Sequence, residues 1–266
     1  MKKKIWGNTI VKNEGRYIYF ALSSVVNFLD KILVWDTGSR DDTVDIIKFV
    51  KKKYPQKIEF REIGEVDPVG LTKARQKMLD QTDSDWFVIV DGDEVWWKKS
   101  LSKTINTINQ KGDYLYALVH PVINLIGDIY HFQEEAAGKY EILGRKGHLN
   151  IRAINRKIPG LHIKNTYPLE GYYDKEEKLI QEVGEKLVFI NSHLLHFTHL
   201  NRSSKGSSRK IKYELGIPFP KNFVYPEALH LDFPNIVSSP WIKRSIKYIT
   251  RATIETPFKK IKRKLK

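Results

Sequence analysis

Short apolar runs alternate with segments of helical periodicity through the first third of the chain. The predicted strands are Ile5–Val11, Lys31–Trp35, Lys57–Glu62 and Trp86–Val90, and the predicted helices are Glu14–Leu29, Asp42–Lys53 and Leu71–Asp80. In each predicted helix, apolar residues recur every three or four positions and so share one side. Strands that alternate with helices in this way are typical of βα units and a largely parallel sheet.

The second half of the chain is less regular. Two strand-like segments, Tyr114–His120 and Leu187–Phe197, enclose a stretch rich in glycine, histidine and charge from Gly127 to Asp174, where we expect ligand-binding loops. Asn201–Lys210 is rich in serine and basic residues and is predicted to be a flexible polar loop. The proline-rich segment 218–240 is predicted to run in extended form over the domain surface.

Length and composition favour one domain over residues 1–240, followed by a tail over 241–266. The 266 residues suffice for one large α/β domain, and no composition break requires a second. No stretch approaches the roughly 20 apolar residues needed to cross a bilayer, and the start of the chain lacks the apolar core of a secretory signal. Zero cysteines exclude a disulfide framework and a thiolate metal site. We therefore expect a cytoplasmic protein.

The formal net charge of +15 is concentrated in the tail. Ten Lys or Arg residues and one Glu lie in residues 241–266, so the tail carries +9 and the first 240 residues only +6. Nucleic acid, anionic lipid and a diphosphate ligand all attract Lys and Arg, so charge alone does not separate these partners.

The strongest local signal is Asp91-Gly92-Asp93-Glu94, which directly follows the apolar strand Trp86–Val90. Two carboxylates one residue apart at a strand end can both reach a hard divalent cation, which bridges the phosphates of a nucleotide. An isolated pair of this kind is more often a solvated acidic turn. Here three neighbouring acids follow a strand predicted to be buried, and they repel one another unless a cation is present, which favours a metal site.

A second polar loop, from Asp36 to Thr43, also follows an apolar strand. Capping of the next helix explains Ser39 and Asp41, but it does not require Asp36. A carboxylate at a strand tip can accept hydrogen bonds from a base or a ribose, as acidic residues do in other nucleotide-binding α/β folds. Because ligands of such sheets lie beyond the carboxyl ends of the strands, we expect Asp36 and Asp91–Glu94 at one edge.

Four motifs together resemble those of the family 2 glycosyltransferases. They are Ile10-Val11-Lys12-Asn13-Glu14, the loop from Asp36 to Thr43, Lys73-Ala74-Arg75-Gln76, and the segment from Asp85 to Glu94. They occur in the family's order and near its spacing over residues 8–97, and the later half of the chain matches more loosely. The resemblance implies an α/β fold of the GT-A type, a Rossmann-like, mixed and mainly parallel sheet flanked by helices. Residues 1–97 would bind the nucleotide sugar and residues 98–240 the acceptor.

Carried over residue by residue, the resemblance implies a set of nucleotide-sugar contacts. Asp36 would recognise the nucleotide, with Val11 and Glu14 near the base. Arg75 would face the base or the diphosphate, and Asp91 would hold the ribose or a metal-bound water.

The resemblance also implies a cofactor, Mn²⁺ or Mg²⁺, ligated by Asp93. Family members often supply another metal or phosphate ligand from a late His-aromatic pair, and His196-Phe197 is the best match. The candidate metal ligands are therefore Asp93, His196 and Asp91. The alternative for His193, His196 and His199 is that they are ordinary strand and loop histidines.

An inverting transfer needs a carboxylate that deprotonates the acceptor hydroxyl, placed across the sugar from the metal. In many relatives a glutamate follows an arginine-containing segment, which here is Arg152–Arg156. Glu170 is the first candidate and Asp174 the second. The family's usual His-Glu pair is absent because a leucine precedes Glu170, and either acid could instead be a solvated loop charge. Asp128 and Glu134 are the candidates if neither acts.

The tail from Trp241 to Lys266 has the pattern of a basic amphipathic helix. Ile242, Ile246 and Ile249 recur at helical spacing, with Lys243, Arg244, Lys247 and Arg251 on the other face. This pattern is typical of a helix that lies on an anionic membrane surface, so we expect a peripheral protein on the inner face of the cell membrane. A C-terminal helix packed on its own domain is the alternative.

Two other function classes fit parts of the sequence. A nucleotidyltransferase also uses an α/β sheet and acidic metal ligands, but it is expected to have a glycine-rich phosphate loop, and Ile5–Gly15 contains only two glycines. A basic nucleic-acid-binding protein would use the tail, but it leaves the carboxylates at the strand ends unexplained. The sequence thus favours a transferase that takes a nucleoside diphosphate sugar and a glycan, lipid-linked or protein acceptor, with no nucleic-acid partner.

Overall fold

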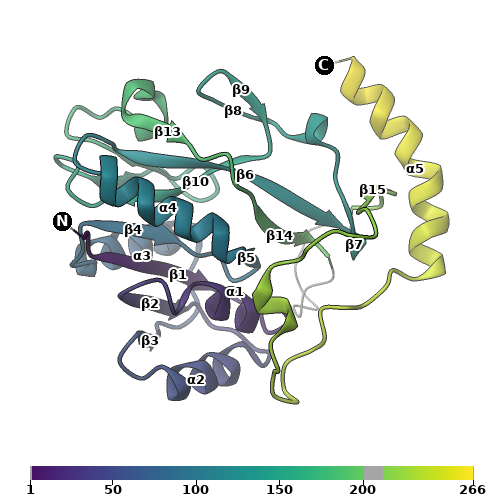
Figure 1. Cartoon of the computed structure of the whole chain (residues 1–266), viewed down its shortest axis with the longest axis horizontal. Coiled ribbons are helices and arrows are strands. Elements are labelled where there is room, and N and C mark those ends of the chain that lie inside the picture. The colour runs from purple at the N-terminus through teal and green to yellow at the C-terminus, as the bar shows by residue number, and fades with distance from the viewer. Residues whose placement is uncertain (1, 201–211, 266) are drawn as a thin grey trace.

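The computed structural model describes residues 2–200 and 212–265, and the predicted loop Asn201–Lys210 lies outside them. A mixed sheet forms its centre (Figure 1), with the strand order β15-β7-β6-β10-β4-β1-β2-β3; β13 and β14 also pair with β6, and β5 pairs with β14. The strands are β1 (Ile5–Val11), β2 (Lys31–Asp36), β3 (Ile58–Glu62), β4 (Trp86–Ile89), β5 (Glu94–Trp96), β6 (Ala117–Ile126), β7 (Asp128–Phe132), β10 (Leu149–Asn155), β13 (Leu187–Phe189), β14 (Leu194–His199) and β15 (Ile217–Pro218).

Helices flank this sheet, and two small hairpins form separate two-stranded sheets. The helices are α1 (Ile18–Val25), α2 (Thr43–Lys53), α3 (Pro68–Gln81), α4 (Lys98–Lys111) and α5 (Ile246–Lys264), with short 3₁₀ turns η1 (Glu135–Ala137), η2 (Ile180–Glu182), η3 (Gly184–Lys186) and η4 (Glu227–His230). The hairpins are β8 (Tyr140–Ile142) with β9 (Arg145–Gly147), and β11 (His162–Lys164) with β12 (Gly171–Tyr173). The predicted α/β architecture with a helical tail is confirmed.

Successive side chains of a strand pack on opposite faces of the central sheet. Strand residues point alternately to opposite faces, so Ile5 joins the cluster that includes α1, α2 and α4, whereas Trp6 packs with Ala74 and Met78 of α3. β1 pairs in parallel with both β2 and β4, and β2 pairs in parallel with β3. The carboxyl ends of these strands therefore meet at one edge, where the polar loops follow.

One helix was not predicted, and two other segments differ from the expectations. Residues 98–111 form α4, whose Leu101 and Ile108 pack into the core although the segment is largely polar. The predicted strand Leu187–Phe197 divides into β13 and β14, which pair with successive parts of β6. The stretch 127–174, expected to be loops, contains β10, which lies between β4 and β6. Arg152 interrupts the apolar pattern of this strand, so the strand was not predicted. The residue is buried only because it pairs with Asp91 and Glu94, which lie far away in the sequence.

The proline-rich segment is extended over the surface, as predicted, apart from η4, where Ala228 and Leu229 are buried. The tail then forms α5, which runs along one edge of the molecule (Figure 1). Tyr248 and Ala252 pack inward, so the alternative of a helix packed on its own domain is what the structure shows. None of the helices in the described parts of the chain is long and apolar enough to cross a membrane.

The structure of the tail differs from the prediction at two residues. Ile242 precedes α5, and Arg244, expected on a solvent-facing basic surface, donates from its backbone N–H to Asp128 at 3.2 Å and from Nη1 to the carbonyl of Leu215 at 2.5 Å. Tertiary contacts therefore fix the orientation of the tail. The division into residues 1–97, 98–240 and 241–266 stays a prediction.

Candidate functional site

A cavity of about 870 Å³ opens beyond the carboxyl ends of β1 and β4. Its walls come from both halves of the chain, and seven of the nine predicted site residues line it: Val11, Glu14, Arg75, Asp91, Asp93, Glu170 and His196. Gly92 permits the acidic loop to lie against β1, because a Cβ at this position would come within 2.9 Å of the Val11 side chain. The fold therefore brings the acidic loop and the late candidate residues to one place.

Arg152 on β10 links two of the acidic residues. Its Nη2 donates to Asp91 Oδ2 at 3.0 Å and also to Glu94 Oε1. Glu94 is fully buried, and this burial raises the pKa of its carboxyl group despite the nearby guanidinium. Burial opposes the charge on Arg152, but Glu94 and Asp91 raise the pKa of Arg152. This role of Arg152 was not predicted from the sequence. The one feature that could have indicated it is the presence of a charged residue between apolar ones, Ile151 and Ala153.

Asp93 and His196 form a second pair on the wall of the cavity. His196 Nε2 lies 3.3 Å from Asp93 Oδ2, and both residues are largely buried. The pairing of β14 with β5 sets His196 opposite Glu94, which follows Asp93 in the chain. Burial alone would lower the pKa of His196, but the carboxylate of Asp93 raises it.

This pair fits a divalent cation. The 3.3 Å between the two donor atoms is close to the roughly 3.0 Å that separates adjacent ligands of an octahedral ion with bonds of about 2.1 Å. Within residues 2–200 and 212–265, no group of three or more His, Cys, Asp or Glu side chains is arranged to hold a metal ion. Mg²⁺ is commonly held by one or two carboxylates together with substrate phosphates, so two protein ligands suit a site that a diphosphate completes.

Asp36 shapes the loop that it begins. Its Oδ2 accepts hydrogen bonds from the backbone N–H groups of Gly38 and Ser39, both at 2.9 Å, and its Oδ1 accepts one from the Ser39 hydroxyl. Gly38 has a φ of +83°, which favours glycine. Of the described residues in this loop, Thr37 lines the cavity. Asp36 is thus committed to the loop backbone, and a direct contact with the nucleotide stays a prediction.

The two candidate bases have different surroundings. Glu170 lies on the cavity wall with Oε1 3.4 Å from Arg75 Nε, and its Oε2 is buried with no hydrogen-bond partner in the described part of the chain. Asp174 is buried, and its Oδ1 accepts from the N–H groups of Glu176 and Lys178, which fixes a turn. The structure brings Glu170, and not Asp174, to the cavity.

The two reserve candidates hold the tail. Asp128 Oδ1 lies 2.6 Å from His131 Nδ1, and Asp128 Oδ2 accepts from the backbone of Arg244. Glu134 accepts a hydrogen bond from Arg263 of α5 at 2.5 Å. Both carboxylates therefore have structural partners.

The model of the family described as Glycosyl transferase family 2 matches residues 9–167, which is more than half of the chain. The chain belongs to this family. The match spans all four motifs of the first half, and it extends through β10 and β11 into the turn that contains Glu170. The acidic loop and Arg152 thus lie within the matched region of this family 2 protein.

Two curated relatives share a short segment with this family 2 protein. The SPbeta prophage-derived glycosyltransferase SunS of Bacillus subtilis (strain 168) and the glycosyltransferase SunS of Bacillus phage SPbeta are each 34% identical to it over 99 residues. The segment covers 35% of this chain and 21% of each relative, so the chain matches about a fifth of the length of the curated relatives.

Solved structures of other transferases are more distantly similar. The mannosyltransferase PcManGT from Pyrobaculum calidifontis, in complex with GDP-Man and Mn²⁺, is 15% identical with a TM-score of 0.49, over 74% of this chain and 57% of that one. S. aureus TarS 1-349 in complex with UDP-GlcNAc is 16% identical with a TM-score of 0.49, over 79% and 62%. Similarity at this level assigns neither donor nor acceptor to this family 2 protein.

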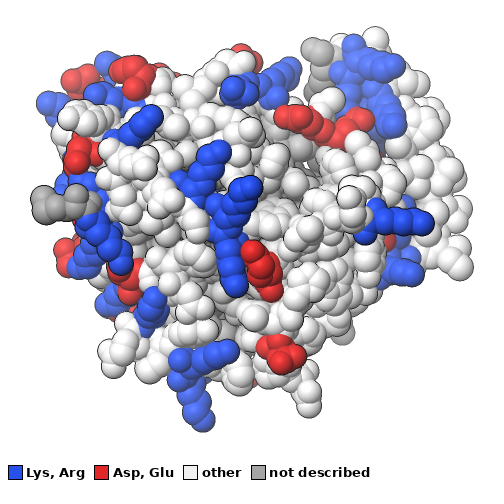
Figure 2. Space-filling model, in the orientation of Figure 1, with Lys and Arg blue, Asp and Glu red and all other residues white. Residues whose placement is uncertain are grey.

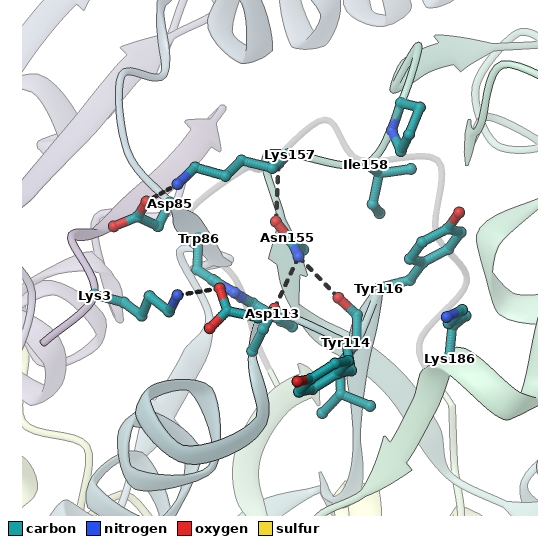
Figure 3. A pocket seen from close by; sticks show the side chains of 13 residues that line it. Lys3, Asp85, Trp86, Asp113, Tyr114, Tyr116, Asn155, Lys157, Ile158 and Lys186 are labelled. Atoms are coloured by element: carbon teal, nitrogen blue, oxygen red, sulfur yellow. Dashed lines mark hydrogen bonds and ion pairs between the residues drawn. The ribbon is translucent and has the colours of Figure 1, made fainter. Parts of the chain in front are cut away.

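A smaller cavity of about 270 Å³ lies at the other end of β4, beside Trp86 (Figure 3). Its acids are paired with lysines, Asp113 with Lys3 and Asp85 with Lys157, and Asn155 donates to the carbonyls of Gly112 and Leu115. These contacts tie the segment before β1 to the end of α4, and the end of β10 to the segments before β4 and after α4. The acidic residues with candidate chemistry lie at the opposite end of the sheet.

Proposed function

We propose that this protein transfers a sugar from a nucleoside diphosphate sugar to an acceptor hydroxyl, with inversion at the sugar. The observation that carries the proposal is the Asp93–His196 pair, which faces the same cavity as Glu170 in a chain of glycosyl transferase family 2. Asp93 and His196 would hold Mn²⁺ or Mg²⁺, which stabilises the negative charge of a departing diphosphate when bound. Glu170 would accept the proton of the attacking hydroxyl.

The two halves of the chain would divide the substrates between them. Residues 1–97 supply Val11, Glu14 and Arg75 to the cavity and would bind the nucleotide and diphosphate. Residues 98–240 add four tyrosines to the same cavity: Tyr140, Tyr167, Tyr172 and Tyr173. Aromatic rings with polar tips offer both an apolar face and hydrogen bonds, which suits a glycan, a lipid-linked glycan or a protein acceptor.

Arg152 would position the acidic loop without touching the sugar. Its guanidinium holds the Asp91 carboxylate at 3.0 Å, so Asp91 would be oriented to accept a hydrogen bond from the ribose or from a metal-bound water. Arg75 would contribute a further positive charge to the same cavity. Arg75 also contacts Glu170, so the residue that would bind the diphosphate lies next to the proposed base.

Donor hydrolysis tests this function, because water can replace the acceptor. UDP-, GDP- and dTDP-sugars incubated with Mn²⁺ identify the donor, and the rate is then measured for Glu170→Gln. We expect kcat to fall by about 10²-fold or more with an unchanged Kd for the nucleotide, since only proton removal is lost.

Two comparisons decide what the Glu170 result means. Glu176→Gln removes an exposed acid three residues beyond the end of β12 and should leave kcat within about threefold, since surface substitutions are nearly neutral. If Asp174→Asn, and not Glu170→Gln, abolishes turnover, Asp174 is the base. Products that show nucleotidyl transfer instead of sugar release would overturn the proposed function.

We also propose that α5 holds the protein on an anionic membrane surface. Because Tyr248, Ala252 and Thr256 face the domain, the opposite side of the helix faces outward. That outward side carries an apolar stripe that is 57–82% exposed: Ile254, Phe258, Ile261 and Leu265. Lys and Arg gather over the carboxyl-terminal end of α5, while uncharged residues lie along its outer edge (Figure 2). An apolar stripe beside basic residues suits the interface of an anionic leaflet.

The triple variant Phe258→Ser, Ile261→Ser, Leu265→Ser should lose membrane binding and keep its fold, because none of the three side chains packs on the domain. Cosedimentation with phosphatidylglycerol vesicles should fall by about tenfold or more, and wild-type binding should weaken steeply with salt. Val224→Ser, an exposed apolar residue outside the tail, is the control. Equal sedimentation of the triple variant and the wild type would contradict the membrane role of α5.

A further inference from the structure

Three neighbouring strands place Asn124, His196 and Glu94 in one row. In register, His196 of β14 lies opposite Asn124 of β6 on one side and opposite Glu94 of β5 on the other. Neighbouring strands of a sheet lie about 4.8 Å apart, so side chains that are opposite in register come close to each other. The ring of His196 therefore has a fixed neighbour on each side before any ligand binds.

Asn124 contacts two histidines at once. Its Oδ1 lies 3.1 Å from His196 Nδ1, and its Nδ2 lies 2.9 Å from His148 Nδ1. His148 in turn has its Nε2 3.1 Å from the backbone carbonyl of Glu134. Four groups thus form one chain of hydrogen bonds that runs from the Glu134 carbonyl to His196.

The carbonyl of Glu134 sets the direction of this chain. A carbonyl only accepts, so the Nε2 of His148 must carry a hydrogen. Burial lowers the pKa of His148 and keeps the ring neutral, so its Nδ1 is an acceptor and the amide of Asn124 turns its NH₂ group towards it. The Asn124 carbonyl oxygen is then left to accept from His196, whose Nδ1 must carry a hydrogen.

We infer that Asn124 is a positioning residue that fixes the tautomer of His196, so that the Nε2 lone pair faces Asp93 and is available to a divalent cation. This inference rests on the proposed metal dependence. Glu94 is not the partner that fixes the ring, because its Oε1 lies 3.8 Å from His196 Nδ1 and is engaged by Arg152.

The consequence lies at the Asp93–His196 pair. With the hydrogen on Nδ1, the Nε2 of His196 and the Oδ2 of Asp93 are two acceptor atoms 3.3 Å apart, which repel unless a proton or a cation lies between them. Histidines that bind metals usually donate their other ring N–H to a carbonyl or carboxylate, and loss of that partner typically costs 10–100-fold in metal affinity or activity.

Mn²⁺ binding tests the inference by electron paramagnetic resonance, with Mn²⁺ alone and in the presence of UDP or GDP. Asn124→Leu removes both hydrogen bonds and should weaken Mn²⁺ binding by roughly 10–100-fold. Asn124→Asp is the conservative comparison: its carboxylate still accepts from His196 Nδ1 but cannot donate to His148 Nδ1, so Asn124→Asp should bind Mn²⁺ at least about tenfold more tightly than Asn124→Leu. Equal Mn²⁺ affinity of Asn124→Leu and wild type, or equal loss in both variants, would overturn the role of Asn124.

The tautomer itself gives an independent readout. In wild-type protein labelled with ¹⁵N-histidine and loaded with Mg²⁺ and UDP or GDP, His196 should show a protonated Nδ1, and Asn124→Asp should keep this signal. An Nε2–H tautomer would overturn the inference even if Asn124→Leu does not fold. Failure of the wild type to bind Mn²⁺ with either nucleotide would instead refute the proposed metal dependence, while a protonated Nδ1 on neutral His196 in the metal-free protein would still support the role of Asn124.

Discussion

Replacing Asp93 with alanine should lower donor turnover by roughly 10³-fold or more while the protein stays folded. Asp93 is the acidic member of the pair that would hold the cation, and the departing diphosphate carries charge that Arg75 alone would leave largely unbalanced. Metal ions supply several kcal/mol of charge stabilisation to such steps, and each 1.4 kcal/mol corresponds to a factor of ten in rate. Hydrolysis of the identified donor, measured under saturating Mn²⁺, gives the ratio.

Removal of the metal ion should have the same effect as replacement of Asp93. EDTA is expected to abolish donor hydrolysis by the wild type, and added Mn²⁺ or Mg²⁺ to restore it. Asp83→Ala, which removes an acid that is 89% exposed and distant from the cavity lining, is the control for a loss of charge. Undiminished turnover in Asp93→Ala, or in excess EDTA, would refute the metal assignment.

Replacing Arg152 with methionine should destabilise the fold by about 3–5 kcal/mol, because it leaves Glu94 buried without its counter-charge. Glu94 is fully buried, and its Oε2 already has no hydrogen-bond partner among the described residues. Urea unfolding measures the free-energy difference. Arg156→Met loses a hydrogen bond to the Leu79 carbonyl but leaves no buried carboxylate without a counter-charge. It should therefore lower the free energy of unfolding by about 1 kcal/mol.

The pH dependence of the Arg152→Met variant follows from the pKa of Glu94. Burial already raises this pKa, and loss of the guanidinium removes the main opposing charge, so the pKa of Glu94 rises further. When the pKa of a carboxyl group is higher in the folded state than in the unfolded state, the folded state is favoured while the group is protonated. This contribution to stability is lost as the pH rises above the pKa of the unfolded state, which is about 4.5. The variant should therefore be closer to wild type at pH 5 than at pH 8.

A second substitution checks the cause of this instability. Glu94→Gln in the Arg152→Met background removes the stranded charge and should recover at least about 2 kcal/mol and abolish most of the pH dependence. A double variant that is as unstable as Arg152→Met at both pH values would show that the loss arises from packing and not from the buried carboxylate.

The sequence by itself determined the first half of the fold and the outline of the site. β1 has the predicted bounds, and β2, β3 and β4 lie within one residue of theirs. β1, β2 and β4 are short, mainly apolar runs with a polar loop beyond them, and in β3 the apolar Ile58 and Phe60 alternate with charged residues. Parallel strands share the direction of their carboxyl ends, so the loops after β1 and β4 were predictable neighbours. The predicted helix Glu14–Leu29 is present as α1, but α1 is shorter, because the residues at both ends of the predicted range form irregular turns.

Only the tertiary structure decided which polar residues act together. Asn124 and His196 meet because β6 pairs with β14 across 72 residues of chain, and Arg152 reaches Asp91 across 61. No local periodicity marks such pairs, since each residue reads as an ordinary polar position until its partner strand is known. The same reason governs α5: the sequence shows an amphipathic helix, but contacts such as that of Thr256 with Leu215 decide which side faces the domain and which side remains exposed.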